Sequence, residues 1–230
     1  MEQQDSSYTS VIFDLDGTLL YTIPDIADAI NNVLLRYGYP EHEREFYRTA
    51  VGWGLYKATR IALPDEDISD EKVQRMGDEV VSRYRENPVA STVPYTGVVD
   101  LLDTLVDRGI RLSVLSNKED SLTKDVVSRT LGTKYFEVIR GRSTDFPAKP
   151  DPAGALFIME QMGVRPEEVI YVGDSDVDME TAVRGGMYPV GVLWGYRSRE
   201  EILDGGAKML VSEPKEILSL FSERVVSPKS

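Results

Sequence analysis

The feature that most constrains the fold is the alternation of short β-rich runs with helical patterns along the chain. Helical stretches with charged faces separate the later β-rich runs, and this order is typical of the βαβ units that build a parallel sheet. We therefore predict a doubly wound, Rossmann-like α/β domain. The expected strands are residues 8–13, 110–115, 136–139, 168–172 and 188–193, and the expected helices are residues 97–108, 118–131, 153–162 and 176–184.

One long interval breaks this alternation. Between Pro24 and Pro94 no convincing strand occurs, and the apolar residues recur at helical spacing. Pro24 suits the first turn of a helix, and Gly38 suits its end. We predict a small helical domain inserted into the α/β core. The helical domain is expected to span residues 21–94, and the core to comprise residues 1–20 and 95–230.

The last part of the chain is less regular. Beyond Trp194, which we expect to pack near the sheet edge, the pattern predicts a helix and then a short apolar run at 208–211. A further helix is expected at 214–221, followed by a polar tail that we expect to be frayed.

The charge balance narrows the classes of partner. Lysine and arginine number 26 against 39 acidic residues, a net charge of −13, which disfavours nucleic acid and anionic membranes. No apolar run is long enough to span a membrane, and the polar, acidic start differs from a secretory signal. Together with the absence of cysteine, these features predict a cytoplasmic protein, either a monomer or a homodimer.

Two carboxylates follow the first predicted strand, in Asp14-Leu15-Asp16-Gly17-Thr18. The strand period of two places both on one side, and open parallel sheets bind ligands beyond the carboxyl ends of their strands. A solvated turn or a calcium loop is the alternative. An EF-hand loop is disfavoured because it needs a glutamate at its twelfth position, whereas position 25 is Asp in a predicted helix.

Three further polar segments follow later strands or strand-to-helix loops. Ser116-Asn117 could bind phosphate oxygens, although such a pair is more often a helix N-cap. Lys149 lies between a strand and a helix, where an exposed loop lysine is the simpler interpretation. Asp174 and Asp178 belong to an acidic cluster after the fourth strand; a helix cap does not need three acids, whereas Mg²⁺ requires carboxylate ligands.

Each motif alone is a weak signal, but all four are expected at the same edge of one sheet. In this combination the chain resembles the haloacid dehalogenase superfamily of phosphatases. The superfamily's ordered motifs match Asp14-x-Asp16-Gly-Thr18, Ser116, Lys149 and Gly173-Asp174-x-x-x-Asp178. The helical insert resembles that superfamily's helical cap domain.

Within the superfamily the chain looks most like the phosphoglycolate phosphatase group. The supporting stretches are 51–54, 94–97, 116–118 and 192–196. One departure is Tyr21-Thr22, where many relatives carry Asp-Ser; this position borders the cap and puts the substrate in doubt more than the chemistry.

The resemblance implies a role for each acid at the site. Asp14 would attack phosphorus and form an aspartyl-phosphate, and Asp16 would serve as general acid and then as general base. Mg²⁺ would be held by Asp14, the Asp16 backbone carbonyl and Asp174, with Asp178 supporting the metal through water or contacting Lys149 directly.

The remaining implied roles concern phosphate and substrate. Ser116, Asn117 and Lys149 would bind the phosphate, and Thr18 would orient the phosphate or Asp16. Gly52 and Trp53 in the cap could reach the substrate, although Trp53 could equally be a packing residue. The substrate is expected to be a small phosphorylated metabolite. Candidate cations for a substrate carboxylate are Arg48, Lys57 and Arg60.

The resemblance also implies that the cap closes over the site, with residues 19–23 and 93–96 as hinges, although the first linker lacks a glycine. Alternatives on the same fold are a sugar phosphomutase or other phosphotransferase, a pyrophosphatase, and a non-catalytic binding protein. Dehalogenation is disfavoured because it has no use for Asp16 or Asp174. His42, the only histidine, lies in a charged stretch and is expected on the solvated surface.

Overall fold

The computed structural model describes residues 8–64 and 68–221. A six-stranded parallel sheet runs in the order β5-β4-β1-β6-β7-β8. The strands are β1 Ser10–Phe13, β4 Arg111–Glu119, β5 Phe136–Arg142, β6 Val169–Gly173, β7 Tyr188–Val192 and β8 Met209–Val211. This arrangement confirms the predicted doubly wound parallel sheet and adds β8, the short apolar run.

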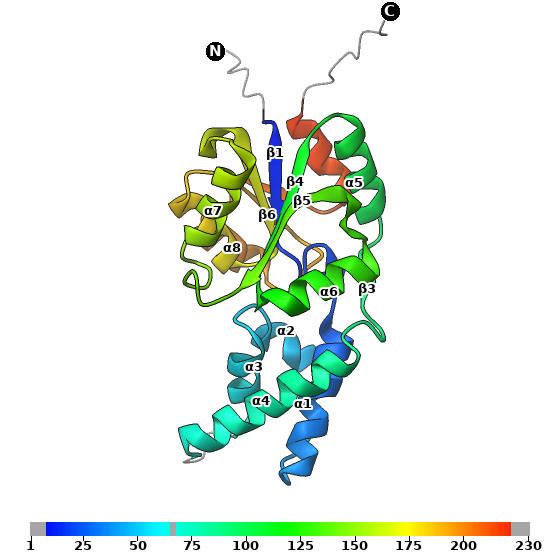
Figure 1. Ribbon diagram of the computed structural model, residues 1–230, viewed down its shortest axis with the longest axis vertical. Helices are drawn as coiled ribbons and strands as arrows, with labels where there is room; N and C mark the ends of the chain where they lie inside the picture. The colour runs from blue at the N-terminus through cyan, green and yellow to red at the C-terminus, as the bar shows by residue number, and fades with distance from the viewer. Residues whose placement is uncertain (1–7, 65–67, 222–230) are drawn as a thin grey trace, which may run out of the picture.

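Helices cover both faces of the sheet (Figure 1). The α-helices of this part are α5 Val98–Asp107, α6 Asp120–Thr130, α7 Ala153–Met162, α8 Asp176–Arg184 and α9 Arg199–Asp204. Short 3₁₀ helices lie at Thr133–Tyr135, Pro166–Glu168 and Pro214–Leu220. The last of these replaces the α-helix expected at 214–221, and the tail expected to be frayed lies outside the described residues.

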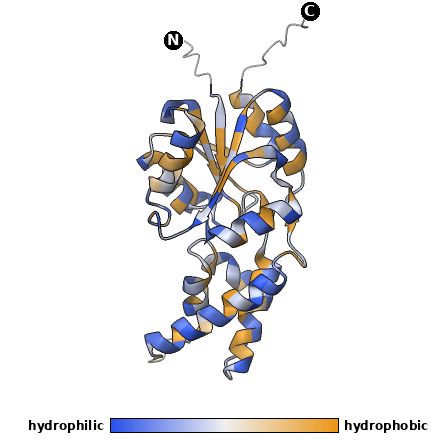
Figure 2. Ribbon diagram, viewed as in Figure 1, coloured by the Kyte–Doolittle hydropathy of each residue, from blue (hydrophilic) through white to orange (hydrophobic). Residues whose placement is uncertain are grey.

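The alternation of β1 explains why both faces are covered. Val11 and Phe13 pack into one buried cluster with α5 and α6, while Ile12 packs into another with α7 and α8. Because successive strand residues point to opposite faces, a strand with apolar residues on both of its faces, as at 11–13, needs cover on both sides. Figure 2 shows the result, with hydrophobic strands inside and helices that are hydrophilic on their outer faces.

The segment from residue 23 to residue 86 is mainly helical among its described residues and has its own buried core. It contains α1 Ile23–Arg36, a 3₁₀ helix Arg44–Phe46, α2 Tyr47–Ala50, α3 Leu55–Ala62 and α4 Asp70–Glu86. These helices pack together beyond the carboxyl ends of the strands (Figure 1). Pro24 lies in the first turn of α1 and Gly38 follows its end with φ of +79°, as expected. The boundaries at 21–94 remain a prediction.

The two linkers differ from the expectation of no strand in this region. Leu20–Tyr21 (β2) pairs antiparallel with Val93–Pro94 (β3), and Tyr95 donates its N–H to the Leu19 carbonyl at 3.1 Å. A strand of two residues is too short to give a periodic signal in the sequence, so the pattern did not predict this pairing. Because of the pairing, the two predicted hinges are joined to each other by backbone hydrogen bonds.

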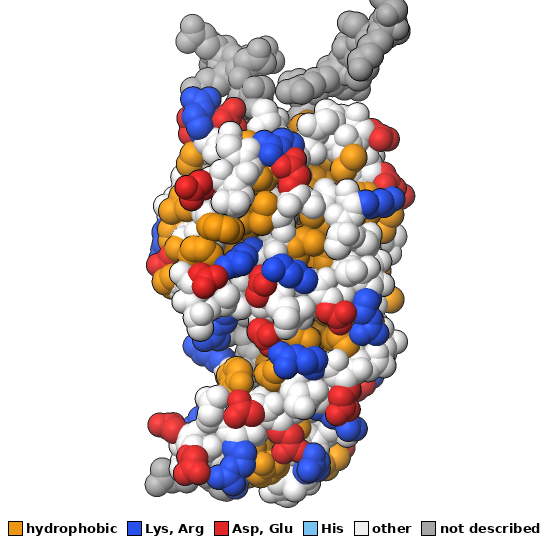
Figure 3. All heavy atoms as spheres, in the orientation of Figure 1, with side chains coloured by type: hydrophobic (Ala, Val, Ile, Leu, Met, Phe, Trp, Pro, Cys, Tyr) orange, Lys and Arg blue, Asp and Glu red, His pale blue; other side chains and the backbone are white. Residues whose placement is uncertain are grey.

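Within the described residues no helix is long and apolar enough to cross a membrane. On the face shown in Figure 3, acidic and basic side chains are interspersed over both the α/β core and the helical insert.

Candidate active site

The candidate site lies where the strand order of the sheet reverses. From β1 the chain crosses to β4 and β5 on one side, and it later continues through β6, β7 and β8 on the other. In open α/β sheets this switch point leaves a crevice at the strands' carboxyl ends. A pocket that is partly open to solvent lies there between the sheet and the helical insert.

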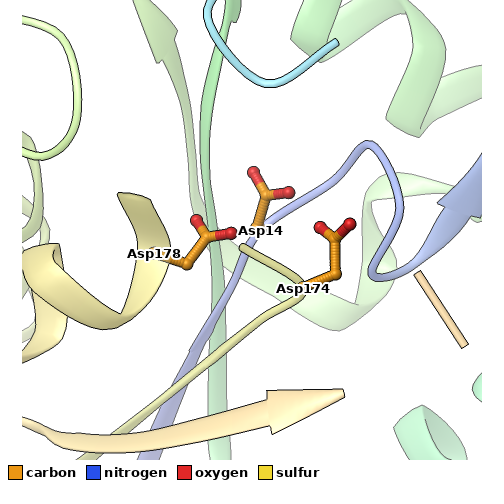
Figure 4. Close-up of side chains that lie close together, drawn as sticks. All are labelled: Asp14, Asp174 and Asp178. Carbon is orange, nitrogen blue, oxygen red and sulfur yellow. The ribbon is translucent and has the colours of Figure 1, made fainter. Parts of the chain in front are cut away.

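Three carboxylates converge in this pocket. Asp14 follows β1, Asp174 follows β6, and Asp178 lies in α8; their oxygens come within 4.8 Å of one another (Figure 4). Burial raises the pKa of Asp14 well above its ordinary value; Lys149 opposes this, and Asp178 and Asp174 add to it. Burial, reinforced by Asp178, also raises the pKa of Asp174 to about 7. The cluster therefore favours a bound cation.

Lys149 supplies a cation to two of these acids. Its ammonium donates to Asp14 Oδ1 and to Asp178 Oδ1, each at 2.6 Å, and to the Leu115 carbonyl at 3.3 Å. Burial opposes the charge, but Asp14 and Asp178 outweigh burial and raise the pKa of Lys149 well above its ordinary value. Lys149 is therefore a buried ammonium beside Asp14 and differs from an exposed loop lysine.

Asp178 and Asp174 also accept hydrogen bonds from groups other than Lys149. Asp178 accepts from the Ser175 hydroxyl at 2.6 Å, which also caps α8. Asp174 accepts from the Thr18 hydroxyl at 3.2 Å and from the Tyr196 N–H at 2.7 Å. Thr18 thus contacts an acid of the cluster; a direct role toward phosphate or Asp16 stays a prediction.

Asp16 is paired with a lysine to which the sequence analysis assigned no role. Lys118 donates to Asp16 Oδ1 at 2.6 Å and to the Tyr84 hydroxyl at 2.9 Å, and its side chain is only 2% exposed. Burial opposes the charge on Lys118, but Asp16 and Tyr84 raise its pKa. Tyr84 belongs to α4, so this chain of contacts links the helical insert to the core.

Replacing Lys118 with Met should leave Asp16 in a mostly buried site without its cation. Removal of one partner from a buried ion pair costs about 3 kcal/mol, and misplacing an acid–base group costs roughly 100-fold in rate. Denaturant unfolding and phosphate release measure the two effects. Lys124→Met, which removes an exposed lysine paired with Asp120, is the control. A Lys118→Met protein as stable and active as the wild type would contradict this role.

Ser116 and Asn117 lie on β4 itself, because β4 resumes pairing with β5 at Glu119 after a register shift. Both line the pocket. The Asn117 side chain accepts from the Lys149 N–H at 2.9 Å and donates to the Gly52 carbonyl at 3.0 Å. Asn117 therefore positions the backbone of Lys149 and contacts the insert, while phosphate binding by Ser116 and Asn117 stays a prediction.

The insert contributes a loop to the pocket. Gly52 lines it, whereas Trp53 does not; the Lys57 ammonium lies 4.5 Å from the centre of the Trp53 ring. Arg48 donates to the Gly195 carbonyl at 2.6 Å and also lies outside the pocket lining. The proposed cations of the insert, Arg48, Lys57 and Arg60, are thus not brought into the pocket.

Two aromatic residues mentioned above have packing roles. His42 is half-buried, stacks on Phe46 with ring centres 4.0 Å apart and lies 2.8 Å from the Ala62 carbonyl. The expectation of a solvated surface histidine is therefore wrong, because the surrounding charged residues are exposed while the ring turns inward. Trp194 packs against the core and donates to the Thr18 carbonyl at 3.0 Å.

The loop after β7 contributes Tyr196 and Arg197 to the pocket lining. The Tyr196 hydroxyl accepts from the Thr22 N–H at 3.0 Å, and Arg197 donates to the carbonyls of Arg48, Thr49 and Val51. No role was expected for Tyr196 or Arg197. The available signals were that Tyr196 belongs to the stretch 192–196, which supports the resemblance, and that Arg197 directly follows it.

A family model described as haloacid dehalogenase-like hydrolase matches residues 11–192, which is most of the chain. The chain belongs to the haloacid dehalogenase-like hydrolases. It is 31% identical over 217 residues to the phosphoglycolate phosphatase of Aquifex aeolicus, with 94% of this chain and 98% of the relative covered.

Two solved structures support the same assignment of fold. A Lactobacillus delbrueckii protein provisionally described as a phosphoglycolate phosphatase superposes with a TM-score of 0.87 and 25% identity, covering 94% of this chain and 100% of that one. A Thermotoga maritima protein provisionally described as a β-phosphoglucomutase gives a TM-score of 0.69 and 27% identity, covering 92% and 97%. Within the haloacid dehalogenase-like family, the chain is a hydrolase of the phosphatase type.

The residues present fit the divalent cation that phosphatases of this family generally use. Asp14, Asp174 and Asp178 offer buried carboxylate oxygens, the ligand type that hard cations prefer. The backbone approaches Asp174 closely at Gly17, which has φ of +95°; a Cβ there would lie 2.3 Å from Asp174 Oδ2. Glycine is therefore required beside this carboxylate.

Proposed function

We propose that the protein is a Mg²⁺-dependent phosphatase that hydrolyses a small phosphate monoester, such as phosphoglycolate, through an aspartyl-phosphate intermediate. The observation that carries this proposal is the buried Asp14 carboxylate held by Lys149 in the pocket at the switch point. A positioned carboxylate with an adjacent cation is the arrangement that covalent phosphoryl transfer requires.

In the first step an Asp14 oxygen attacks phosphorus, and the bond from phosphorus to the ester oxygen breaks. Asp16 gives a proton to the departing alkoxide; in the second step it takes a proton from the water that cleaves the aspartyl-phosphate, which frees Asp14 and releases phosphate. Lys149 and Ser116 bind the transferring oxygens. The contact of Lys118 with Asp16 holds the Asp16 carboxylate in place for both steps.

Asp14, Asp174 and the Asp16 backbone carbonyl would hold Mg²⁺, with Asp178 in support. When bound, Mg²⁺ neutralises negative charge at the phosphoryl group. We expect the site to need Mg²⁺ because the pocket lining contains four aspartates and three basic residues, a formal net charge of −1. A divalent cation changes this to +1, which favours a phosphate dianion.

The relatives named phosphoglycolate phosphatase support phosphoglycolate as the substrate. The insert lies directly over the pocket and contributes Gly52, Leu55 and Ala58 to its lining, so it restricts the size of the substrate. A second candidate function, sugar phosphomutase, is favoured only by the similarity to the Thermotoga maritima protein.

Phosphate release from phosphoglycolate, p-nitrophenyl phosphate, glucose 1-phosphate and pyrophosphate, measured with Mg²⁺ and with EDTA, tests the proposal. We expect hydrolysis of the first two, loss of activity in EDTA and recovery with added Mg²⁺. Glucose 6-phosphate formed from glucose 1-phosphate would indicate a mutase. Preferential cleavage of pyrophosphate, or turnover of none of them, would reject the proposal.

Asp174→Asn should raise the Mg²⁺ concentration needed for half-maximal rate, because it removes a ligand charge. We expect an increase of roughly 10- to 100-fold, the range seen when the surroundings of metal ligands are altered. The control is Asp176→Asn, since Asp176 lies in the same segment but does not line the pocket. An unchanged Mg²⁺ requirement in Asp174→Asn would remove Asp174 from the metal site.

A further inference from the structure

Arg197 is the one pocket-lining cation without an acidic partner among the described residues. Lys149 is paired with Asp14 and Asp178, and Lys118 is paired with Asp16. No carboxylate of the described chain lies within ion-pair distance, 4.0 Å, of the half-buried Arg197 side chain. The two lysines are therefore ion-paired, whereas Arg197 acts on Asp174 and Glu201 only from beyond ion-pair distance, where its charge lowers their pKa, and it is open to a further ligand.

The contacts of Arg197 orient the guanidinium without neutralising it. Nη1 donates to the Arg48 carbonyl, and Nη2 donates to the carbonyls of Thr49 at 3.3 Å and Val51 at 2.8 Å. All three acceptors are uncharged and lie at the end of α2 in the insert. The planar guanidinium has five N–H donors, so these contacts hold it in place and leave donor capacity.

At one position beside this guanidinium, Gly52, the insert carries no side chain. Gly52, which also lines the pocket, has φ of +117°, and a Cβ at this position would lie 3.4 Å from Arg197 Nη2. A larger residue would therefore place its side chain against the guanidinium, where glycine leaves room. Arg197 and the reacting groups Asp14 and Lys149 line the same pocket.

We propose that Arg197 binds a carboxylate at the non-reacting end of the substrate and so selects short phosphorylated carboxylic acids. This inference rests on the proposed phosphatase function. It adds the substrate class and the residue that recognises the substrate. A guanidinium recognises a carboxylate through paired hydrogen bonds with matched geometry. The cation that selects the substrate thus comes from the core loop after β7, in place of the insert cations Arg48, Lys57 and Arg60.

The test compares phosphoglycolate with ethyl phosphate and p-nitrophenyl phosphate, which lack the carboxylate. In Arg197→Gln we expect kcat/KM for phosphoglycolate to fall roughly 10- to 100-fold, mainly through KM, because hydrogen bonds to charged groups are among the stronger ones. For ethyl phosphate and p-nitrophenyl phosphate, kcat/KM should change less than about 3-fold, well below that loss. Arg197→Lys, which keeps the charge, should recover part of the loss.

The matched control is Arg48→Gln. Arg48 also joins the insert to the core through a carbonyl, that of Gly195, but it does not line the pocket. Arg48→Gln should leave the ratio of kcat/KM between phosphoglycolate and the two substrates without a carboxylate unchanged. Equal losses on all substrates in Arg197→Gln would reduce Arg197 to a structural contact between insert and core and overturn the inference.

The outcomes also separate this inference from the proposed function. A wild-type protein that hydrolyses none of the three esters with Mg²⁺ would reject the phosphatase proposal itself. A wild-type protein that hydrolyses them, with a substrate preference that Arg197→Gln leaves unchanged, would reject only the carboxylate-binding role.

Discussion

Replacing Asp14 with Asn should reduce steady-state phosphate release by at least about 10⁴-fold, because the neutral amide cannot serve as the nucleophile. Asn has nearly the same shape as Asp, and it removes a charge that burial and the neighbouring Asp178 and Asp174 disfavour. We therefore expect the fold to persist. Phosphate release with saturating Mg²⁺ and thermal unfolding measure the two expectations.

A covalent intermediate gives this prediction a second readout. Rapid quenching of the wild-type reaction should trap phosphate on the protein, and Asp14→Asn should trap none. Asp176→Asn, which alters an acid outside the pocket lining, should keep both turnover and labelling. Wild-type turnover by Asp14→Asn with saturating Mg²⁺ would exclude the covalent mechanism.

Replacing Lys149 with Met should reduce both activity and stability. The ammonium is 5% exposed and contacts Asp14 and Asp178, so its removal leaves two buried carboxylates without their cation. Breaking a buried pair in this way costs about 3–5 kcal/mol of folding free energy. Loss of the cation that binds the transferring oxygens should lower kcat/KM by roughly 10³-fold.

Mg²⁺ separates these two effects of Lys149→Met. Added Mg²⁺ should recover part of the lost stability by binding the acidic cluster that has lost its lysine, whereas kcat/KM should stay low because the oxygen-binding ammonium is still missing. Lys124→Met, the exposed control, should change stability by less than about 1 kcal/mol. Full activity of Lys149→Met would show that Lys149 does not contact the reacting phosphate.

Much of the fold could be predicted because it rests on local pattern. The strand Ser10–Phe13 with its apolar run at 11–13, the helical period of α7 and α8, and the helix stop at Gly38 all depend on residues that are close together in the sequence. The strands in the two linkers and the end of β4 were harder to predict from the sequence. The pairing of Leu20–Tyr21 with Val93–Pro94, and the continuation of β4 to Glu119, depend on partners that are distant in the chain.

The same division holds at the site. Asp14, Asp174 and Lys149 each follow a strand or precede a helix, so topology alone brings them to one sheet edge, and they meet there. Trp53 shows the limit of that reasoning, because a residue between two glycines can turn either way; in the structure it stays out of the pocket lining and packs near Lys57.

By itself, the sequence determined the parallel α/β architecture, the helical insert and the acids and lysine at the strand ends, because hydrophobic period and motif spacing are local properties. Only the tertiary structure decided which cations are neutralised: Lys118 meets Asp16 across 102 positions, and Arg197 meets the carbonyl of Val51 across 146. The physical reason is that ion pairing and burial depend on distance in space. The lack of an ion pair at Arg197 among the described residues, and the substrate class we infer from it, follow from those long-range contacts.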